Sequence, residues 1–174
     1  QKGNPRQPMA GGHRPTGTMR TRRDRPIRRD QRGLAQSTES AVLLKNDGDL
    51  LPLAAGASVA VIGDFAETPR YQGAGSSAVN SIKVDTFLDC LTGSGLHRVG
   101  FAAGFDRQGK PDDAKKAEAV ALAKKADTVL LCLGLDEIKE SEGLDRADMK
   151  LADNQIELLQ AVQQANPNTV VIVS

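Results

Sequence analysis

Four short apolar runs, separated by helix-like segments, most strongly limit how this chain can fold. The runs are SVAVI, LHRVGFA, TVLLCL and TVVIV, at residues 58–62, 96–102, 128–133 and 169–173. Each is bounded by turn residues, as is typical of strands buried on both faces. One helix is predicted in each interval, and this alternation favours right-handed crossovers onto a mostly parallel sheet with helices on both faces. The predicted fold class is therefore α/β, a flavodoxin-like α/β sandwich.

The predicted helices have apolar residues three and four positions apart, which places them on one side. We expect helices at residues 34–44, 84–91, from Pro111 to about Lys125, and 154–165. The predicted core-facing residues, in that order, are Leu34, Ala35, Val42 and Leu43; Val84, Phe87, Leu88 and Leu91; Ala114, Ala117, Val120 and Ala121; and Ile156, Leu159, Val162 and Ala165.

Charge divides the chain into a basic arm, residues 1–33, and a domain, residues 34–174. The arm holds ten Lys and Arg against Asp24 and Asp30, a net charge of +8, so the rest must carry −7 to give the chain's total of +1. A basic arm can bind nucleic acid, but this one lacks the aromatic residues on which bases stack, which disfavours that function. The arm is either an extended tail or sequence foreign to the domain, introduced at a junction or by a reading-frame change.

Several classes of partner and site are not expected. No apolar run approaches the roughly 20 residues that span a bilayer, so no membrane partner is predicted. No secretory signal is visible, which leaves cytoplasmic and secreted locations both open. Cys90 and Cys132 lie in apolar segments without a C-x-x-C spacing and are predicted to be buried free thiols. No cofactor and no metal site are predicted.

An acidic, glycine-broken loop at residues 134–154 is the candidate functional segment. It follows the predicted strand 128–133, and open α/β sheets place their chemistry at the carboxyl ends of parallel strands. Its centre presents Glu142 beside Gly143. Glu142 is either a carboxyl group presented into a cleft or part of a solvated connection, and spacing alone does not choose between the two.

A second polar loop, residues 65–81, follows the predicted strand 58–62. In a dinucleotide-binding fingerprint the glycines follow the strand immediately, whereas here Gly73 comes ten residues after Gly63, so nucleotide binding is rejected. The loop is expected either to face a ligand at the same sheet edge as Glu142 or to be only a structural turn.

Four segments together resemble the opening of the second, α/β sandwich domain of family 3 glycoside hydrolases. They are SAVLLKNDGDLLPL, VAVIGDFAETPRYQGAGSS, ESEGLDRADMKLADNQIELLQAV and ANPNTVVIVS. The resemblance covers residues 34–174 and implies a retaining β-glycosidase, β-glucosidase-like, in which a preceding (β/α)8 barrel supplies the nucleophile aspartate. In members with the pattern Glu-Gly-x-Asp-Arg, the second domain supplies the general acid/base. That role falls on Glu142, whose pKa we expect to be raised when substrate is enclosed between the domains.

The resemblance also suggests roles for four other residues. We expect Asp145 and Arg146 to pair and to fix the loop, and Arg70 and Gln72 to contact the sugar. The chain contains no Trp, so the family's Ser-Asp-Trp nucleophile segment cannot be present in it. We therefore expect no catalysis by this chain alone, because a β-glycoside substrate would also need the missing barrel domain. The alternative function is a non-catalytic carbohydrate- or partner-binding α/β domain.

The chain stops directly after the apolar run 169–173. We therefore expect an α/β domain cut short at its C-terminus. An uncovered strand edge recruits other strands, so we also expect self-association.

Overall fold

The computed structural model describes residues 39–174, so the basic arm and the start of the helix predicted at 34–44 lie outside the described residues. The chain divides into two units, Gln1–Leu44 and Lys45–Ser174. Residues 41–44 are neither helical nor buried, so that part of the prediction for 34–44 is wrong. Glu39 is helical, but Val42, Leu43 and Leu44 are exposed, so no packed apolar face extends the helix through these residues.

Four parallel strands form one sheet in the order β2-β1-β3-β4. The strands are β1 (Ser58–Ile62), β2 (His97–Ala102), β3 (Thr128–Leu133) and β4 (Thr169–Val173). Val61 in β1 lies opposite Phe101 on one side and Leu130 on the other. Every residue of β3 is buried, because a central parallel strand is covered on both faces. The predicted α/β class with a parallel sheet is confirmed.

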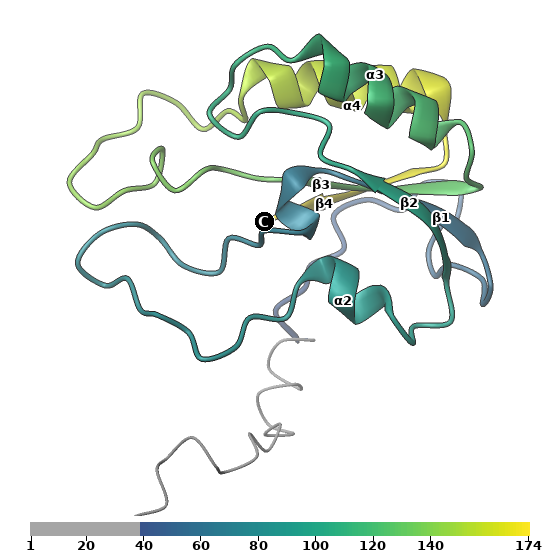
Figure 1. Ribbon diagram of the computed structural model, residues 1–174, viewed down its shortest axis with the longest axis horizontal. Helices are drawn as coiled ribbons and strands as arrows, with labels where there is room; N and C mark the ends of the chain where they lie inside the picture. The colour runs from purple at the N-terminus through teal and green to yellow at the C-terminus, as the bar shows by residue number, and fades with distance from the viewer. Residues whose placement is uncertain (1–38) are drawn as a thin grey trace, which may run out of the picture. The chain divides into compact units, whose positions relative to one another are not determined.

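Helices cover the two faces unequally. Helices α3 (Asp113–Ala123) and α4 (Asp153–Ala165) lie on one face, and α2 (Phe87–Leu91) lies on the other (Figure 1). A 3-10 helix, η2 (Asp64–Ala66), follows β1 directly. The connections that leave β1 and β3 therefore pass to opposite faces, although these strands are neighbours. This reversal creates a switch point at their carboxyl ends, which is where open α/β sheets bind ligands.

The buried face of α3 differs from the predicted one. Ala119 and Ala123 are buried, whereas Ala114, Ala117 and Ala121 are exposed. An alanine-rich helix offers several similar stripes, and here the stripe with Ala119, Leu122 and Ala123 packs against the core. Leu122 packs close over Gly100 of β2, where a Cβ atom would come within 2.9 Å of its side chain.

The buried face of α4 was predicted in part. Val162 is buried and Leu159 and Ala165 pack against the core, but Ile156 is exposed and Gln155 takes a core position. The Gln155 amide is satisfied there: its Oε1 accepts from the Gly134 amide at 3.1 Å, and its Nε2 donates to the Gly134 carbonyl at 2.8 Å. A buried amide is tolerated when it is hydrogen-bonded in this way.

Helix α2 is shorter than predicted. It begins after Thr86, which forms a capping box with Asp89, so Val84 lies outside it. The expected buried thiol is correct for Cys132, whose pKa burial raises to about 12, but wrong for Cys90, which is exposed because a helix of five residues buries little of its surface. No helix within residues 39–174 is long and apolar enough to cross a membrane.

The outer edge of β4 generates a prediction of self-association. Within the described residues β4 pairs only with β3, and its Val171 and Val173 are 40% and 61% exposed. An unpaired apolar edge pairs readily with a second copy, so the mass measured by light scattering should rise with concentration.

A lysine on an edge strand blocks such pairing, so Val173→Lys should keep the chain monomeric. Ile82→Lys is the matched control, since Ile82 is also exposed but lies between β1 and α2. Wild-type chain that stays monomeric throughout the dilution series contradicts the prediction.

Candidate functional site

Two long loops project from the same end of the sheet (Figure 1). The β1 loop is residues 63–86 and the β3 loop is residues 134–152. A parallel bridge joins Ala74 to Ser141, and the Glu142 amide donates to the Ala74 carbonyl at 3.0 Å. The prediction that the segment 65–81 lies at the same sheet edge as Glu142 is confirmed, whereas its ligand-facing role stays a prediction.

The Glu142 carboxylate is held by the β1 loop. Its Oε2 accepts from the Ser76 hydroxyl at 2.6 Å and from the Ser76 amide at 2.7 Å. These two bonds favour the ionised form and so lower the pKa of Glu142, which is exposed. The raised pKa expected for this residue belongs to an enclosed, substrate-bound site and stays a prediction.

Gly75 makes this contact sterically possible. Its φ is +132°, and a Cβ atom at this position would lie 2.5 Å from the Glu142 Cβ and 2.7 Å from its Oε2. A glycine is therefore required for the β1 loop to approach the glutamate so closely.

Two arginines hold Glu140, two residues before Glu142. Arg70 pairs with its Oε2 and also donates to the Leu135 carbonyl at 3.4 Å, while Arg146 donates to its Oε1 at 3.2 Å. The Arg70 side chain is only 12% exposed, which makes this link less screened than a surface ion pair.

The expected ion pair between Asp145 and Arg146 is not formed. Arg146 turns to Glu140, where it shares one carboxylate with Arg70, and Asp145 is exposed with no hydrogen bond or ion pair within the described part of the chain. Arg146 does link two parts of the β3 loop, but through Glu140, which the sequence pattern did not single out.

Gln72 closes the β1 loop on itself. Its Oε1 accepts from the Val79 amide at 2.9 Å and its Nε2 donates to the Val79 carbonyl at 3.0 Å. Arg70, Gln72 and Glu137 line a hollow of about 240 Å³. The structure thus brings Arg70 and Gln72 together, and their contact with a sugar stays a prediction.

Arg107, which sequence reasoning missed, connects the segment after β2 to both loops. Its Nε donates to Asp64 at 2.6 Å and its Nη1 to Glu137 at 2.8 Å, while its Nη2 donates to the Thr68 carbonyl. Its guanidinium also lies 4.4 Å from the centre of the Phe65 ring. Its only signal in the sequence was a position shortly after a strand, because its partners lie 30 to 43 residues away.

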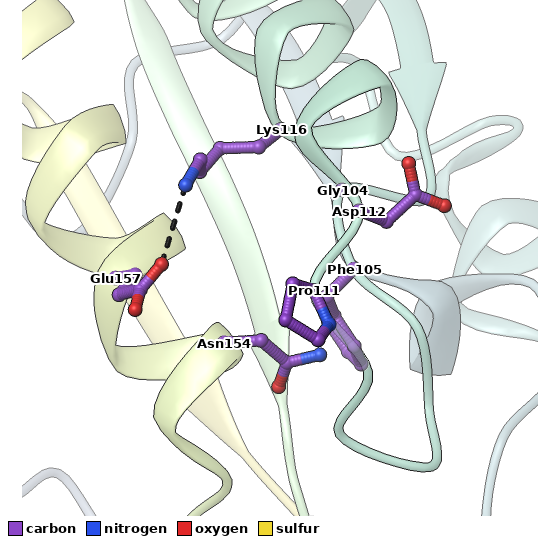
Figure 2. Close-up of a pocket in the computed structure, with 7 residues that line it drawn as sticks. All are labelled: Gly104, Phe105, Pro111, Asp112, Lys116, Asn154 and Glu157. Atoms are coloured by element: carbon purple, nitrogen blue, oxygen red, sulfur yellow. Dashed lines mark hydrogen bonds and ion pairs between the residues drawn. The ribbon is translucent and has the colours of Figure 1, made fainter.

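A second hollow lies where α3 and α4 begin (Figure 2). Lys116 crosses it to reach Glu157 at 3.2 Å and also pairs with Asp113 at 3.2 Å, and these bonds raise the Lys116 pKa. This hollow has a volume of about 10 Å³, which holds roughly one water molecule, so the hollow does not accommodate a sugar. Within residues 39–174 no group of three or more His, Cys, Asp or Glu could hold a metal ion.

The fold and the site define a doubly wound α/β domain with a carboxylate fixed above its switch point. The chain belongs to glycoside hydrolase family 3, because residues 41–174 match the Glycosyl hydrolase family 3 C-terminal domain.

Relatives of this chain carry glycosidase names. It is 48% identical over 146 residues to an exo-alpha-(1->6)-L-arabinopyranosidase of Bifidobacterium longum, covering 78% of this chain and 19% of that protein. It is 35% identical to thermostable beta-glucosidase B of Acetivibrio thermocellus, covering 79% and 18%. The crystal structure of a Bifidobacterium adolescentis GH3 beta-glucosidase matches with a TM-score of 0.70 and 51% identity, covering 76% of this chain and 19% of that one. The chain thus spans about a fifth of these relatives' length.

The close approach at Gly75 predicts that Gly75→Ala displaces Glu142 from Ser76. Gly56→Ala is the matched control, since Gly56 also has a positive φ, +78°, but nothing lies within 4 Å of an added Cβ. Both variants bear a backbone cost of roughly 1–2 kcal/mol. Only the Gly75 variant should also shift the Glu142 amide resonance in NMR spectra, because that amide donates to the Ala74 carbonyl and the added Cβ would collide with the Glu142 side chain. A Glu142 amide resonance unchanged by Gly75→Ala would show that the two loops do not meet at this point.

The contacts of Arg107 predict that Arg107→Ala lowers the free energy of unfolding by about 2 kcal/mol, since it leaves two partly buried carboxylates without their partner. Arg98→Ala, at an exposed position of β2, should change it by less than about 0.5 kcal/mol. Urea denaturation measures both, and equal losses would show that Arg107 does not stabilise the loops.

Proposed function

We propose that Glu142 is the general acid/base of a retaining glycosidase whose nucleophile is carried by a barrel domain outside this chain. The observation that carries the proposal is the fixed position of the Glu142 carboxylate, held by the loops of two neighbouring strands at the sheet's carboxyl edge. Membership of a family whose relatives are named glycosidases supports it.

Retaining hydrolysis uses two carboxyl groups about 5–5.5 Å apart. One attacks the sugar, and the other first gives a proton to the leaving oxygen and later removes a proton from the attacking water. In this proposal the chain supplies the second group. The lowered pKa of Glu142 suits proton removal, and enclosure by a second domain would raise it toward the value that proton donation requires.

Exposed apolar side chains on the same loops support a domain partner. Tyr71 and Val79 in the β1 loop, and Ile138, Leu144 and Met149 in the β3 loop, are largely exposed. Apolar surface of this kind is typical of an interface. We propose that the barrel domain covers it and brings its aspartate toward Glu142.

The substrate class we propose is a glycoside with a terminal O-glycosidic bond, β-glucosidase-like in its chemistry. Relatives of this chain are named for different sugars: an arabinopyranosidase, a beta-glucosidase and an exo-1,4-beta-xylosidase. The residues that line the sugar-binding subsite and select the sugar would come mostly from the barrel domain.

A second candidate function is a non-catalytic carbohydrate- or partner-binding domain. The hollow lined by Arg70, Gln72 and Glu137 favours it, because convergent polar side chains around a recess are typical of ligand sites. In this case the chain would bind sugar, but changing Glu142 would not alter turnover in a complete enzyme.

The test uses a complete enzyme, in which residues 41–174 replace the matching stretch of the Bifidobacterium longum relative. Glu142→Gln removes the transferable proton and nearly keeps the shape, so glycosides with poor leaving groups should lose about 10²–10⁴-fold in kcat/KM. Aryl glycosides with good leaving groups need less protonation and should lose less. Azide, a nucleophile that needs no general base, should then accelerate turnover of the covalent intermediate.

The matched controls are Glu140→Gln and Glu137→Gln, which remove neighbouring carboxylates that are engaged with arginines. Neither should show azide rescue. Rescue in one of these variants would assign the acid/base to that residue, and equal slowing of all substrates by Glu142→Gln without rescue would reject the proposal.

A further inference from the structure

The two oxygens of the Glu142 carboxylate have different surroundings. Both hydrogen bonds from Ser76 end on Oε2, and Oε1 receives no hydrogen bond from any residue in the described range 39–174. A carboxyl group that exchanges a proton with substrate needs one free oxygen, and here that oxygen is Oε1.

Ser76 and Glu142 are fixed relative to each other by backbone contacts. The Glu142 amide donates to the Ala74 carbonyl at 3.0 Å, so the glutamate contacts residues on both sides of Gly75. A turn follows directly, in which the Ala78 amide donates to the Gly75 carbonyl at 3.2 Å. The Ser76 hydroxyl is therefore held in place against one carboxylate oxygen.

Resting on the proposed function, we infer that Ser76 is a positioning residue that clamps Oε2 of Glu142 and thereby leaves Oε1 as the oxygen that gives and takes the proton. When Oε1 gives its proton to the leaving oxygen, the carboxylate that forms is stabilised by the Ser76 amide and hydroxyl. When water attacks the covalent intermediate, its proton returns to Oε1. Ser76 keeps its own proton throughout, so the proton is conserved over the cycle.

Charged neighbours do not account for the ionisation of Glu142. Arg70 and Arg146 are paired with Glu140, and Arg107 is paired with Glu137, while Asp145 is exposed. The causes of the lowered pKa are the Ser76 hydroxyl first and the Ser76 amide second, opposed by desolvation. The clamp is therefore a local hydrogen-bond effect, and salt should screen it weakly.

The first test detects the hydrogen bonds from Ser76 to Glu142 and does not depend on enzymatic activity. In the full 174-residue chain, the titration midpoint of the Glu142 carboxyl carbon is followed by NMR, with Glu142→Gln to assign the resonance. Ser76→Ala removes the hydroxyl but keeps the amide, so the midpoint should move to higher pH. Ser76→Thr should restore the wild-type midpoint, and Ser77→Ala should not shift it. A midpoint unchanged in Ser76→Ala overturns the clamp whatever Glu142 does.

The second test measures the pH dependence of kcat/KM in the complete enzyme described above. Protonated Glu142 is needed for the first step, so its pKa sets the basic limb of the profile. Ser76→Ala should move this limb to higher pH, and Ser76→Thr should restore it. If Ser76→Ala lowers kcat/KM but leaves the basic limb of the pH profile unmoved, then Ser76 has only a structural role. A raised NMR midpoint with an unmoved limb would instead reject Glu142 as the acid/base, and with it the part of Ser76 in catalysis.

Discussion

The parallel pairing of β1 with β3 is the interaction on which the site depends. These strands lie side by side in the centre of the sheet, and their connections leave toward opposite faces. The pairing resumes beyond the sheet at Ala74 and Ser141, which places Ser76 against Glu142. The position of the carboxylate is thus set by the backbone of a buried sheet, although the glutamate itself is exposed.

Partly buried arginines stabilise this arrangement at two further points. Arg70 connects the β1 loop to Glu140, and Arg107 connects the segment after β2 to Asp64 and Glu137. Each guanidinium also donates to a backbone carbonyl. A lysine could not make the same set of bonds, because its ammonium group lacks the planar, fixed arrangement of N–H donors. These long loops leave most of their large apolar side chains exposed, so ion pairs and hydrogen bonds hold them together.

The protonation of Glu142 follows from the same geometry. An exposed carboxylate with two hydrogen bonds from Ser76 is stabilised in its ionised form, which is the form that accepts a proton. Proton donation requires the opposite shift, and burial is the physical means of producing it. Under the proposed function, a site divided between two domains would provide that burial only while the domains enclose substrate, which would let Glu142 serve both steps.

The sequence by itself determined the strands, the parallel α/β class and the loop that carries Glu142, because these depend on local periodicity and on turn residues. Four segments also indicated the family, which the match over residues 41–174 shows. Only the tertiary structure decided that Gln155 is buried, that Arg146 pairs with Glu140 instead of Asp145, and that Ser76 holds Glu142. The Ser76 contact joins residues 66 positions apart, and local spacing cannot reveal contacts that exist only once the sheet aligns the two loops.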